Sequence, residues 1–356
     1  MDPYAFRSAV SPADPAAAAA ARERIDNLIK PVGSLGRIEE LAVQLCAIAG
    51  GMPQHVYERR TILIGAGDHG VAADGVSAYP PEVTAQMVGS FLAGFAAINA
   101  FARTARAEVY VANFGVREAL PEHPRLFDVN AGYGTANLAH GPAIRRDHLP
   151  YTLAAGIAAY DAAIEAAPCD VLALGEMGIG NSTSAAAIVA AFTGKPVREV
   201  VGRGTGIDDE RLERKIRSVE RALARCQDFT WEEIASQMGG YEIVGLAGVI
   251  LCAARARLPV VLDGYIVAAA ALIAGAIAPA ALGYCIAAHR SQEPGHALAL
   301  DALGLTPLLD LEMRLGEASG AALALPVIES AARMVREMKT FADAGVATAP
   351  SAVIVP

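Results

Sequence analysis

The chain has 356 residues and a formal net charge of −9, which excludes the broad basic face that a nucleic-acid backbone partner requires. Hydrophobic residues make up 54% and charged residues 19%, so most of the chain cannot be disordered. Five scattered cysteines without a CxxC pair exclude a disulfide scaffold and a cysteine zinc site, and they indicate a reducing, cytoplasmic compartment. The length predicts about two domains.

The N-terminal residues 1–26 lack the basic start and apolar core of a secretory signal. Residues 14–50 have a helical pattern without a convincing strand, and so do residues 306–342. We therefore expect residues 1–54 and 306–356 to form a smaller helical domain beside a core of residues 55–305. The last residues, 346–356, are open to two interpretations, an edge strand or an unpacked tail.

Short apolar runs typical of buried strands are spaced along the middle of the chain, with Ala-rich helical stretches such as Pro81–Arg103 and Tyr151–Ala167 between them. The predicted strands are Thr61–Ile64, Glu108–Ala112, Asp170–Leu174, Pro259–Leu262 and Leu282–Ala287. Because fully apolar strands alternate with helices, the pattern predicts an α/β fold with a parallel sheet that helices cover on both faces.

The uncharged stretch Gly264–Ala288 approaches the length of a membrane span. It consists mostly of Ala and Gly and contains Pro279, and Ala contributes little to membrane insertion. We interpret it as a buried helix of about fourteen residues that starts at Tyr265, followed by a turn and the last strand. No membrane span is expected.

Ligands of parallel sheets bind at the carboxyl ends of the strands, so the residues after each strand are candidate site residues. The first such segment, residues 65–88, has three glycines, Gly65, Gly67 and Gly70, that allow close approach of a ligand, and it also contains Asp68 and His69. A Gly-rich turn with a structural Asp explains the same pattern. A metal site is not expected, because no second His or carboxylate stands at ligand spacing.

The second segment, residues 175–188, runs from glycines into an Ala-rich helix with the N-cap residues Asn181, Ser182 and Thr183. Free N–H groups and the helix dipole at such a start suit a phosphate. The segment is neither a Walker loop nor a dinucleotide fingerprint. Glu176 at its edge is suited to stabilise positive charge on a sugar.

Two further segments contain polar candidates. In residues 201–216, Lys215 follows a Gly-rich loop as either a phosphate partner or a solvated charge. In residues 288–300, Ser291 is suited to a phosphate or ribose pocket, whereas His289 and His296 are more typical of structural or exposed histidines.

The fifth segment, residues 314–334, places Glu317 among small residues before a helix, within the expected helical domain. A carboxylate in such apolar surroundings tends to have a raised pKa, which suits a general base near neutral pH. A helix N-terminal Glu that the dipole satisfies explains the pattern equally well.

Seven segments, in order, resemble those of the nicotinate-nucleotide–dimethylbenzimidazole phosphoribosyltransferases. They are KPVGSLGRIEELA (30–42), GAGDHGVAADGVSAYPPEVTAQMV (65–88), GEMGIGNSTSA (175–185), GRGTGIDD (202–209), GGYEIVGLAG (239–248), LDGYIVAAAAL (262–272) and RLGEASGAA (314–322). The resemblance implies phosphoribosyl transfer from nicotinate mononucleotide to 5,6-dimethylbenzimidazole with inversion at the anomeric carbon. It also implies a Rossmann-like fold, a homodimer, and no metal or cofactor.

The resemblance also implies site residues. Glu317 would be the general base and Glu176 would act at the ribose centre. The wall of the base pocket would consist of Ser77, Tyr79, Gln86, Met177 and Leu315. The phosphate and ribose would be bound by Gly178, Gly180, Asn181, Gly204, Lys215, Asp263 and Ser291.

Two departures from the family pattern stand out. Ala318 follows Glu317 where the family usually has Gly, and Asn113 occupies a position where an Asp is common. Both bear on the preferred base and not on the reaction class. Two alternatives stay open: transfer to another flat acceptor such as adenine or a phenol, and a non-catalytic nucleotide-binding homologue.

Overall fold

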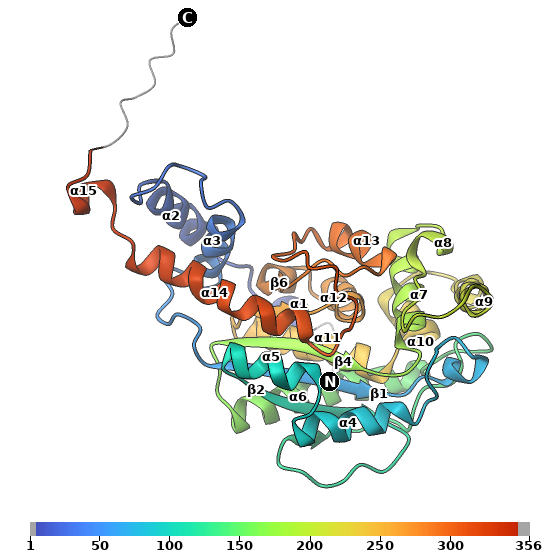
Figure 1. The fold of residues 1–356 in the computed structure, drawn as a ribbon. Coiled ribbons are helices and arrows are strands. Elements are labelled where there is room, and N and C mark those ends of the chain that lie inside the picture. The colour runs from blue at the N-terminus through green and yellow to red at the C-terminus, as the bar shows by residue number, and fades with distance from the viewer. Residues whose placement is uncertain (1–4, 348–356) are drawn as a thin grey trace, which may run out of the picture. The chain divides into compact units, whose positions relative to one another are not determined.

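The computed structural model describes residues 5–347, and six strands of this range form one sheet in the order β3-β2-β1-β4-β5-β6 (Figure 1). All neighbouring strands pair in parallel. The strands are β1 (Arg60–Gly67), β2 (Ala107–Gly115), β3 (Leu126–Asp128), β4 (Val171–Met177), β5 (Val260–Leu262) and β6 (Cys285–Ala287). This is the strand order of a Rossmann-type doubly wound sheet, so the predicted fold class is confirmed.

Helices connect the strands and follow the last one. Those of the α/β part are α1 (Ala5–Ala9), α4 (Val83–Ala93), α5 (Ala97–Ala105), α6 (Leu149–Ala166), α7 (Asn181–Thr193), α8 (Val197–Val200), α9 (Asp209–Arg225), α10 (Trp231–Met238), α11 (Tyr241–Arg255), α12 (Tyr265–Ile277) and α13 (Pro294–Leu303). Short 3-10 helices are η1 (Gly70–Asp74), η2 (Arg146–His148) and η3 (Pro279–Tyr284). The remaining helices are α2 (Pro15–Asp26), α3 (Arg37–Ala49), α14 (Ser319–Glu337) and α15 (Phe341–Ala344).

Every residue of β1 and β4 is buried, although successive side chains point to opposite faces of the sheet. Both faces of the sheet are therefore covered. Gly65 of β1 faces α11, where a Cβ would lie 3.1 Å from Leu246 Cγ. Gly175 of β4 faces the start of α14, where a Cβ would lie 2.6 Å from the Ala318 Cβ. These glycines let the covering segments approach the strands closely.

All five predicted strands are present, but β1 and β4 extend further than expected. Gly65, Gly67 and Glu176 therefore lie in strands and not in loops. The three-residue strand β3 was not predicted, because so short and half-exposed a run carries little periodicity. Likewise Leu282 belongs to η3, and the last strand begins at Cys285.

The expected helix Pro81–Arg103 is divided into α4 and α5 by Gly94, which has the left-handed φ of 81°. Among the described residues, the stretch Val83–Ala105 passes a length and composition test for crossing a membrane. The break at Gly94 interrupts the continuous helix that a span needs. The uncharged segment from Tyr265 is the buried helix α12, as predicted.

Two compact units make up the chain: residues up to Pro12 with Arg59–Leu325, and Ala13–Glu58 with the residues from Pro326. The first unit contains the sheet. Residues 306–325, which include Glu317, were expected in the helical part. They belong to the α/β unit instead. The reason is that Leu308 N and Leu309 N donate hydrogen bonds to the carbonyl oxygens of Ala287 and Ala288 at the end of β6.

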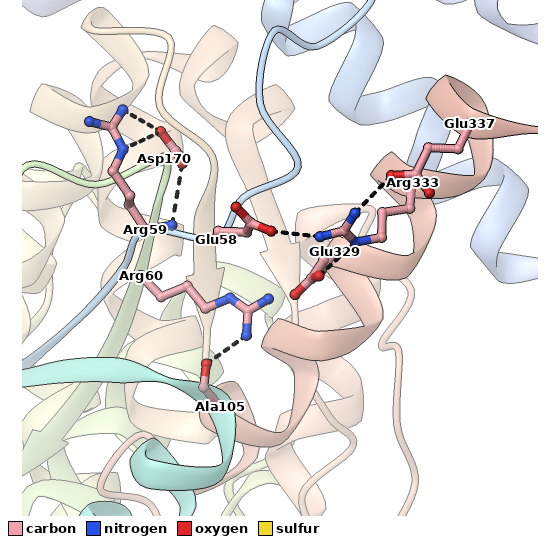
Figure 2. A network of polar contacts seen from close by, with 8 residues as sticks. All are labelled: Glu58, Arg59, Arg60, Ala105, Asp170, Glu329, Arg333 and Glu337. Carbon is pink, nitrogen blue, oxygen red and sulfur yellow. Dashed lines mark hydrogen bonds and ion pairs between the residues drawn. The ribbon is translucent and has the colours of Figure 1, made fainter.

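At the amino end of β1, charged side chains fix neighbouring segments of the α/β unit. Arg59 pairs with Asp170, which directly precedes β4, and Arg60 donates a hydrogen bond of 2.6 Å to the Ala105 carbonyl oxygen at the end of α5 (Figure 2). These contacts lie at the opposite end of β1 from the residues predicted to bind ligand.

The first residues also belong to the α/β unit. Phe6 of α1 is buried, with the Arg255 guanidinium 5.7 Å from its ring centroid. The Tyr284 hydroxyl donates a hydrogen bond of 2.8 Å to the Ser11 carbonyl oxygen. The chain thus passes from this unit into the helical unit at Ala13 and returns to it at Arg59, just before β1.

The helical unit consists of α2, α3, α15 and the part of α14 from Pro326 onward. Asp14 caps α2 by accepting from Ala16 N at 2.8 Å. Arg24 Nε donates to the Val335 carbonyl oxygen at 2.8 Å, which fastens α2 to α14. Arg333 of α14 pairs with three carboxylates, Glu58, Glu329 and Glu337 (Figure 2). Of the tail 346–356, residues from 348 lie outside the described range.

Candidate active site

The candidate site lies at the carboxyl ends of β1 and β4, which are neighbours at the centre of the sheet (Figure 1). From β1 the chain continues to β2 on one side, and from β4 it continues to β5 on the other side. Gly65 pairs with Glu176 and Ala66 with Met177 at this edge. In doubly wound sheets the ligand crevice forms at this topological switch point. The sheet therefore places the first two Gly-rich segments side by side.

The two predicted catalytic carboxylates lie together at this edge. Glu176 is on β4, and its Oε2 accepts a hydrogen bond from Asn181 Nδ2 at the start of α7. The loop before α14 approaches so closely that a Cβ on Gly316 would lie 2.3 Å from Glu176 Oε1. Glu317 follows directly, and both carboxylic side chains are at least nine-tenths buried.

Burial raises the pKa of both carboxyls. The pKa of Glu176 rises to about 8 because of burial first, then the charges of Asp263 and Glu242. The pKa of Glu317 rises to about 7 because of burial and the charge of Asp263. Glu317 is thus poised to take up a proton near neutral pH. Glu176 keeps its proton at neutral pH until a nearby positive charge lowers its pKa.

The turn that presents Glu317 is strained. Gly316, Glu317 and Ala318 have φ of 85°, 62° and 63°, all left-handed. For residues other than Gly this conformation costs about 1–3 kcal/mol, and residues strained in this way cluster at functional sites. The strain therefore supports a functional role for Glu317.

A second polar cluster surrounds Lys215 of α9, which is almost fully buried. Its Nζ donates to Ser182 Oγ at 2.9 Å and to the Gly202 carbonyl oxygen at 3.0 Å. Gly204 N donates to Glu293 Oε1 at 2.9 Å. Burial lowers the pKa of Lys215 to about 8, and the charge of Glu293 opposes this effect. A buried ammonium beside a Gly-rich loop and a helix start is suited to a phosphate.

A buried pair, His69 and Glu242, lies beneath the first Gly-rich segments, with His69 Nε2 2.6 Å from Glu242 Oε1. Three glycines leave room for this pair. A Cβ would lie 2.7 Å from Glu242 Oε2 at both Gly67 and Gly240, and 3.2 Å from Glu242 Oε1 at Gly178. Part of the glycine pattern thus accommodates an internal carboxylate.

Comparisons with known proteins agree with this arrangement. A family profile described as phosphoribosyltransferase matches residues 10–346. The nicotinate-nucleotide–dimethylbenzimidazole phosphoribosyltransferase of Chloroflexus aggregans is 51% identical over 339 residues, covering 95% of this chain and 96% of the relative. The protein of the same name from Thermus thermophilus is 49% identical, covering 94% and 99%. The crystal structure of CobT from Thermus thermophilus matches with a TM-score of 0.90 at 48% identity, covering 94% of this chain and 100% of that one.

The chain belongs to the nicotinate-nucleotide–dimethylbenzimidazole phosphoribosyltransferase family. The resemblance read from the seven sequence segments is thereby confirmed. The roles of the individual site residues stay predictions.

The predicted phosphate and ribose residues fall into four places. Gly204 and Lys215 lie together, and Ser291 joins them because its Oγ accepts from Glu293 N at 3.3 Å. Asn181 contacts Glu176 instead. The other three lie elsewhere: Gly178 and Gly180 line the His69–Glu242 pair, and Asp263 accepts from Ala321 N at 2.9 Å at the start of α14.

The predicted base-binding residues of this phosphoribosyltransferase come from three segments. Ser77 Oγ lies 3.4 Å from Thr205 Oγ1, which links the first loop to the Gly204 loop. Tyr79 and Leu315 expose 56% and 54% of their surface, as side chains of an open binding wall would. Met177 is buried at the end of β4. Gln86 is exposed on α4, and its place in the wall stays a prediction.

Both departures from the family pattern have local explanations. Asn113 Nδ2 donates to Asp128 Oδ1 at 3.0 Å, and its Oδ1 accepts from Val116 N at 2.9 Å. An Asp at position 113 could not donate to Asp128. The methyl group of Ala318 is fully buried opposite Gly175, so its main effect is on the conformation of the turn.

Sequence reasoning missed Glu242 and Glu293 as parts of this family member's site, and named Ser182 only as a helix cap. A lone carboxylate in the apolar helix α11 was a usable signal for Glu242, since unpaired charges are rarely buried. Glu293 had no comparable signal. Both His289 and His296 are buried, and His296 Nδ1 accepts from Ser291 N at 2.9 Å. Within residues 5–347, no three His, Cys, Asp or Glu side chains are grouped to hold a metal ion.

Proposed function

We propose that this protein transfers the phosphoribosyl group of nicotinate mononucleotide to 5,6-dimethylbenzimidazole, with α-ribazole 5′-phosphate and nicotinate as products. One observation carries the proposal: the buried carboxyl of Glu317, whose pKa burial raises to about 7, directly follows Gly316, which lies against Glu176 at the carboxyl edge of the sheet. A protein that only bound nucleotides would have no need of a base there. The names of the relatives, about half identical over nearly the whole chain, support the same reaction.

In the proposed reaction, one ring nitrogen of the benzimidazole attacks the anomeric carbon as the bond to nicotinate breaks. The electron pair of that bond leaves with the nicotinate nitrogen, and the configuration changes from β to α. The other ring nitrogen of the product then carries a proton on a cationic ring. Ionised Glu317 takes up this proton, which avoids a buried, unpaired cation.

The donor would be held by the two clusters described above. Lys215, beside the Gly204 loop, binds its phosphate, and Glu176 lies beside the ribose. As the anomeric carbon becomes positive, the oxygen atoms of the Glu176 carboxyl stabilise the developing charge. The Asn181 side chain keeps one oxygen of this carboxyl in place. The exposed side chains of Tyr79 and Leu315 would cover the flat base.

The decisive experiment is a product assay with purified protein, nicotinate mononucleotide and dimethylbenzimidazole in the presence of a chelator. We expect α-ribazole phosphate and nicotinate in equal amounts, and a product of α configuration by NMR. Donor binding without products, followed by turnover with adenine or a phenol, would assign another acceptor. Binding without turnover for every flat base would identify a non-catalytic homologue and contradict the proposal.

We also propose that the protein acts as a homodimer in the cytoplasm. All five cysteines are free thiols, which suits a reducing compartment. The large exposed side chains of Tyr79 and Leu315 support a surface that a second copy or a ligand completes. Light scattering after gel filtration tests the dimer, and a monomeric mass at micromolar concentration would contradict it.

A further inference from the structure

Asp263 directly follows β5 and is 1% exposed. Among the predicted phosphate and ribose residues, only Lys215 has a polar side chain that is equally buried. Its Oδ1 accepts a hydrogen bond of 2.9 Å from Ala321 N in the first turn of α14. An anion at the start of a helix binds free backbone N–H groups and interacts favourably with the helix dipole. The carboxylate of Asp263 already occupies this position, and α14 begins two residues after Glu317.

The surroundings of Asp263 are closed by an imidazole and by glycines. His289 Nε2 lies 3.8 Å from Asp263 Oδ1, and His289 is itself 1% exposed. The His289 ring fits against Gly320 of α14, where a Cβ would lie 2.0 Å from His289 Cδ2. It also fits beside Gly264, where a Cβ would lie 3.6 Å from Nε2. The Asp263 carboxylate is therefore enclosed by the His289 ring and the start of α14.

We propose that Asp263 is a positioning residue that holds the Glu317 loop in place through the first turn of α14. The three consecutive left-handed residues of this loop need an external constraint, because isolated left-handed Glu and Ala residues are disfavoured. The hydrogen bond from Ala321 N anchors the helix that follows the strained turn. Asp263 thus fixes Glu317 without touching the substrate.

The charge of Asp263 has a second effect on the same site, because it raises the pKa of both Glu317 and Glu176. Replacing the carboxylate by a neutral amide should therefore lower both pKa values, since a like charge is removed. The other charged or titratable groups around this cluster are Glu176 on β4, Glu242 on α11, His289 after β6 and Arg314 in the loop itself. These groups are unchanged in the substitutions proposed below.

The test compares Asp263→Asn with Asp263→Ala. Asn keeps an oxygen that accepts from Ala321 N and loses the charge, whereas Ala loses both. For Asp263→Asn we expect the midpoint of the kcat/KM pH profile to move lower, with the donor KM within about two-fold of wild type. For Asp263→Ala we expect kcat to fall at least about ten-fold at an unchanged donor KM, because Glu317 is misplaced.

A ligand role predicts a different pattern. If Asp263 binds the ribose, both variants raise the donor KM by about ten-fold or more. That result would overturn the proposal. Asp301→Asn, which changes an exposed carboxylate on α13, is the matched control and should leave the pH midpoint, KM and kcat unchanged.

The kinetic comparison rests on the proposed function, since it needs a wild-type protein that forms α-ribazole phosphate. Amide hydrogen exchange does not depend on turnover. We expect exchange at the first turn of α14, including Ala321, to be at least about ten-fold faster in Asp263→Ala and close to wild type in Asp263→Asn. Unchanged exchange in Asp263→Ala would overturn the positioning role even if the wild-type protein proved inactive.

Discussion

Substituting Glu176 by Gln should make the protein more stable at neutral and alkaline pH. Gln keeps a side-chain oxygen that can accept from Asn181 Nδ2, and it removes a buried acid. In the folded protein the pKa of Glu176 is about 8 instead of its usual 4.5. The folded state therefore binds more protons than the unfolded state between these two values, and wild-type stability falls as pH rises through this range.

The expected magnitude follows from the same two pKa values. At about 1.4 kcal/mol for each unit, the rise to about 8 corresponds to about 5 kcal/mol of stability lost between pH 4.5 and pH 8. Most of this loss lies below pH 8, because the folded-state carboxyl begins to ionise only there. The Gln variant has no such loss, so its advantage over wild type should grow with pH and level off above pH 8.

Urea unfolding of both proteins at several pH values between 5 and 9 measures this difference. Glu165→Gln is the matched control, because Glu165 is exposed on α6 and its substitution should leave the pH dependence of stability unchanged. Parallel stability curves for wild type and Glu176→Gln would refute the reasoning, since the folded protein would then hold the Glu176 proton no more tightly than the unfolded chain does.

Three further substitutions give sharp expectations. Glu317→Gln should lower kcat by about 10²–10⁴ while dimethylbenzimidazole still binds, as turnover and calorimetry would show; near-normal turnover would place the base elsewhere. Glu293→Gln should lower the donor KM, because it removes a negative charge beside the Lys215 cluster, and a higher KM would mean that this carboxylate mainly holds the loop. Ala318→Gly should raise the melting temperature by relieving about 1 kcal/mol of strain at φ 63°, and a lower melting temperature would contradict this.

The strands were predictable where they form long apolar runs, as in β1 and β4, because both faces of a parallel sheet are buried. Their ends were not, since Gly is depleted in strands and glycines such as Gly65 and Gly67 are typical of a loop. In the structure these glycines extend β1 because α11 lies close against them. These positions lack side chains because a helix packs against them, and the sequence alone does not show which helix does so.

For the site, chemistry was easier to predict than position. Glu176 and Glu317 were identified as candidates from residue type and resemblance, and the structure brings them together. The pairing of Gly204 with Glu293, and of Asp263 with α14, depends on contacts between segments far apart in the sequence. No local spacing encodes such contacts, so Asp263 was grouped with the ligand-binding residues although its partner is a backbone amide.

The first helix has a consequence for how the protein is made. Ser11 bonds to Tyr284, which lies 273 residues further along the chain, and Phe6 is buried beside Arg255. At about 5–20 residues per second, the ribosome needs about 14–55 s to supply Tyr284 after Ser11. Until Arg255 has been synthesised, the aromatic ring of Phe6 lacks this native contact and is open to chaperones and to neighbouring nascent chains. An N-terminal fusion that shields α1 should therefore raise the yield of folded protein from rapid synthesis more than one attached at the C-terminus.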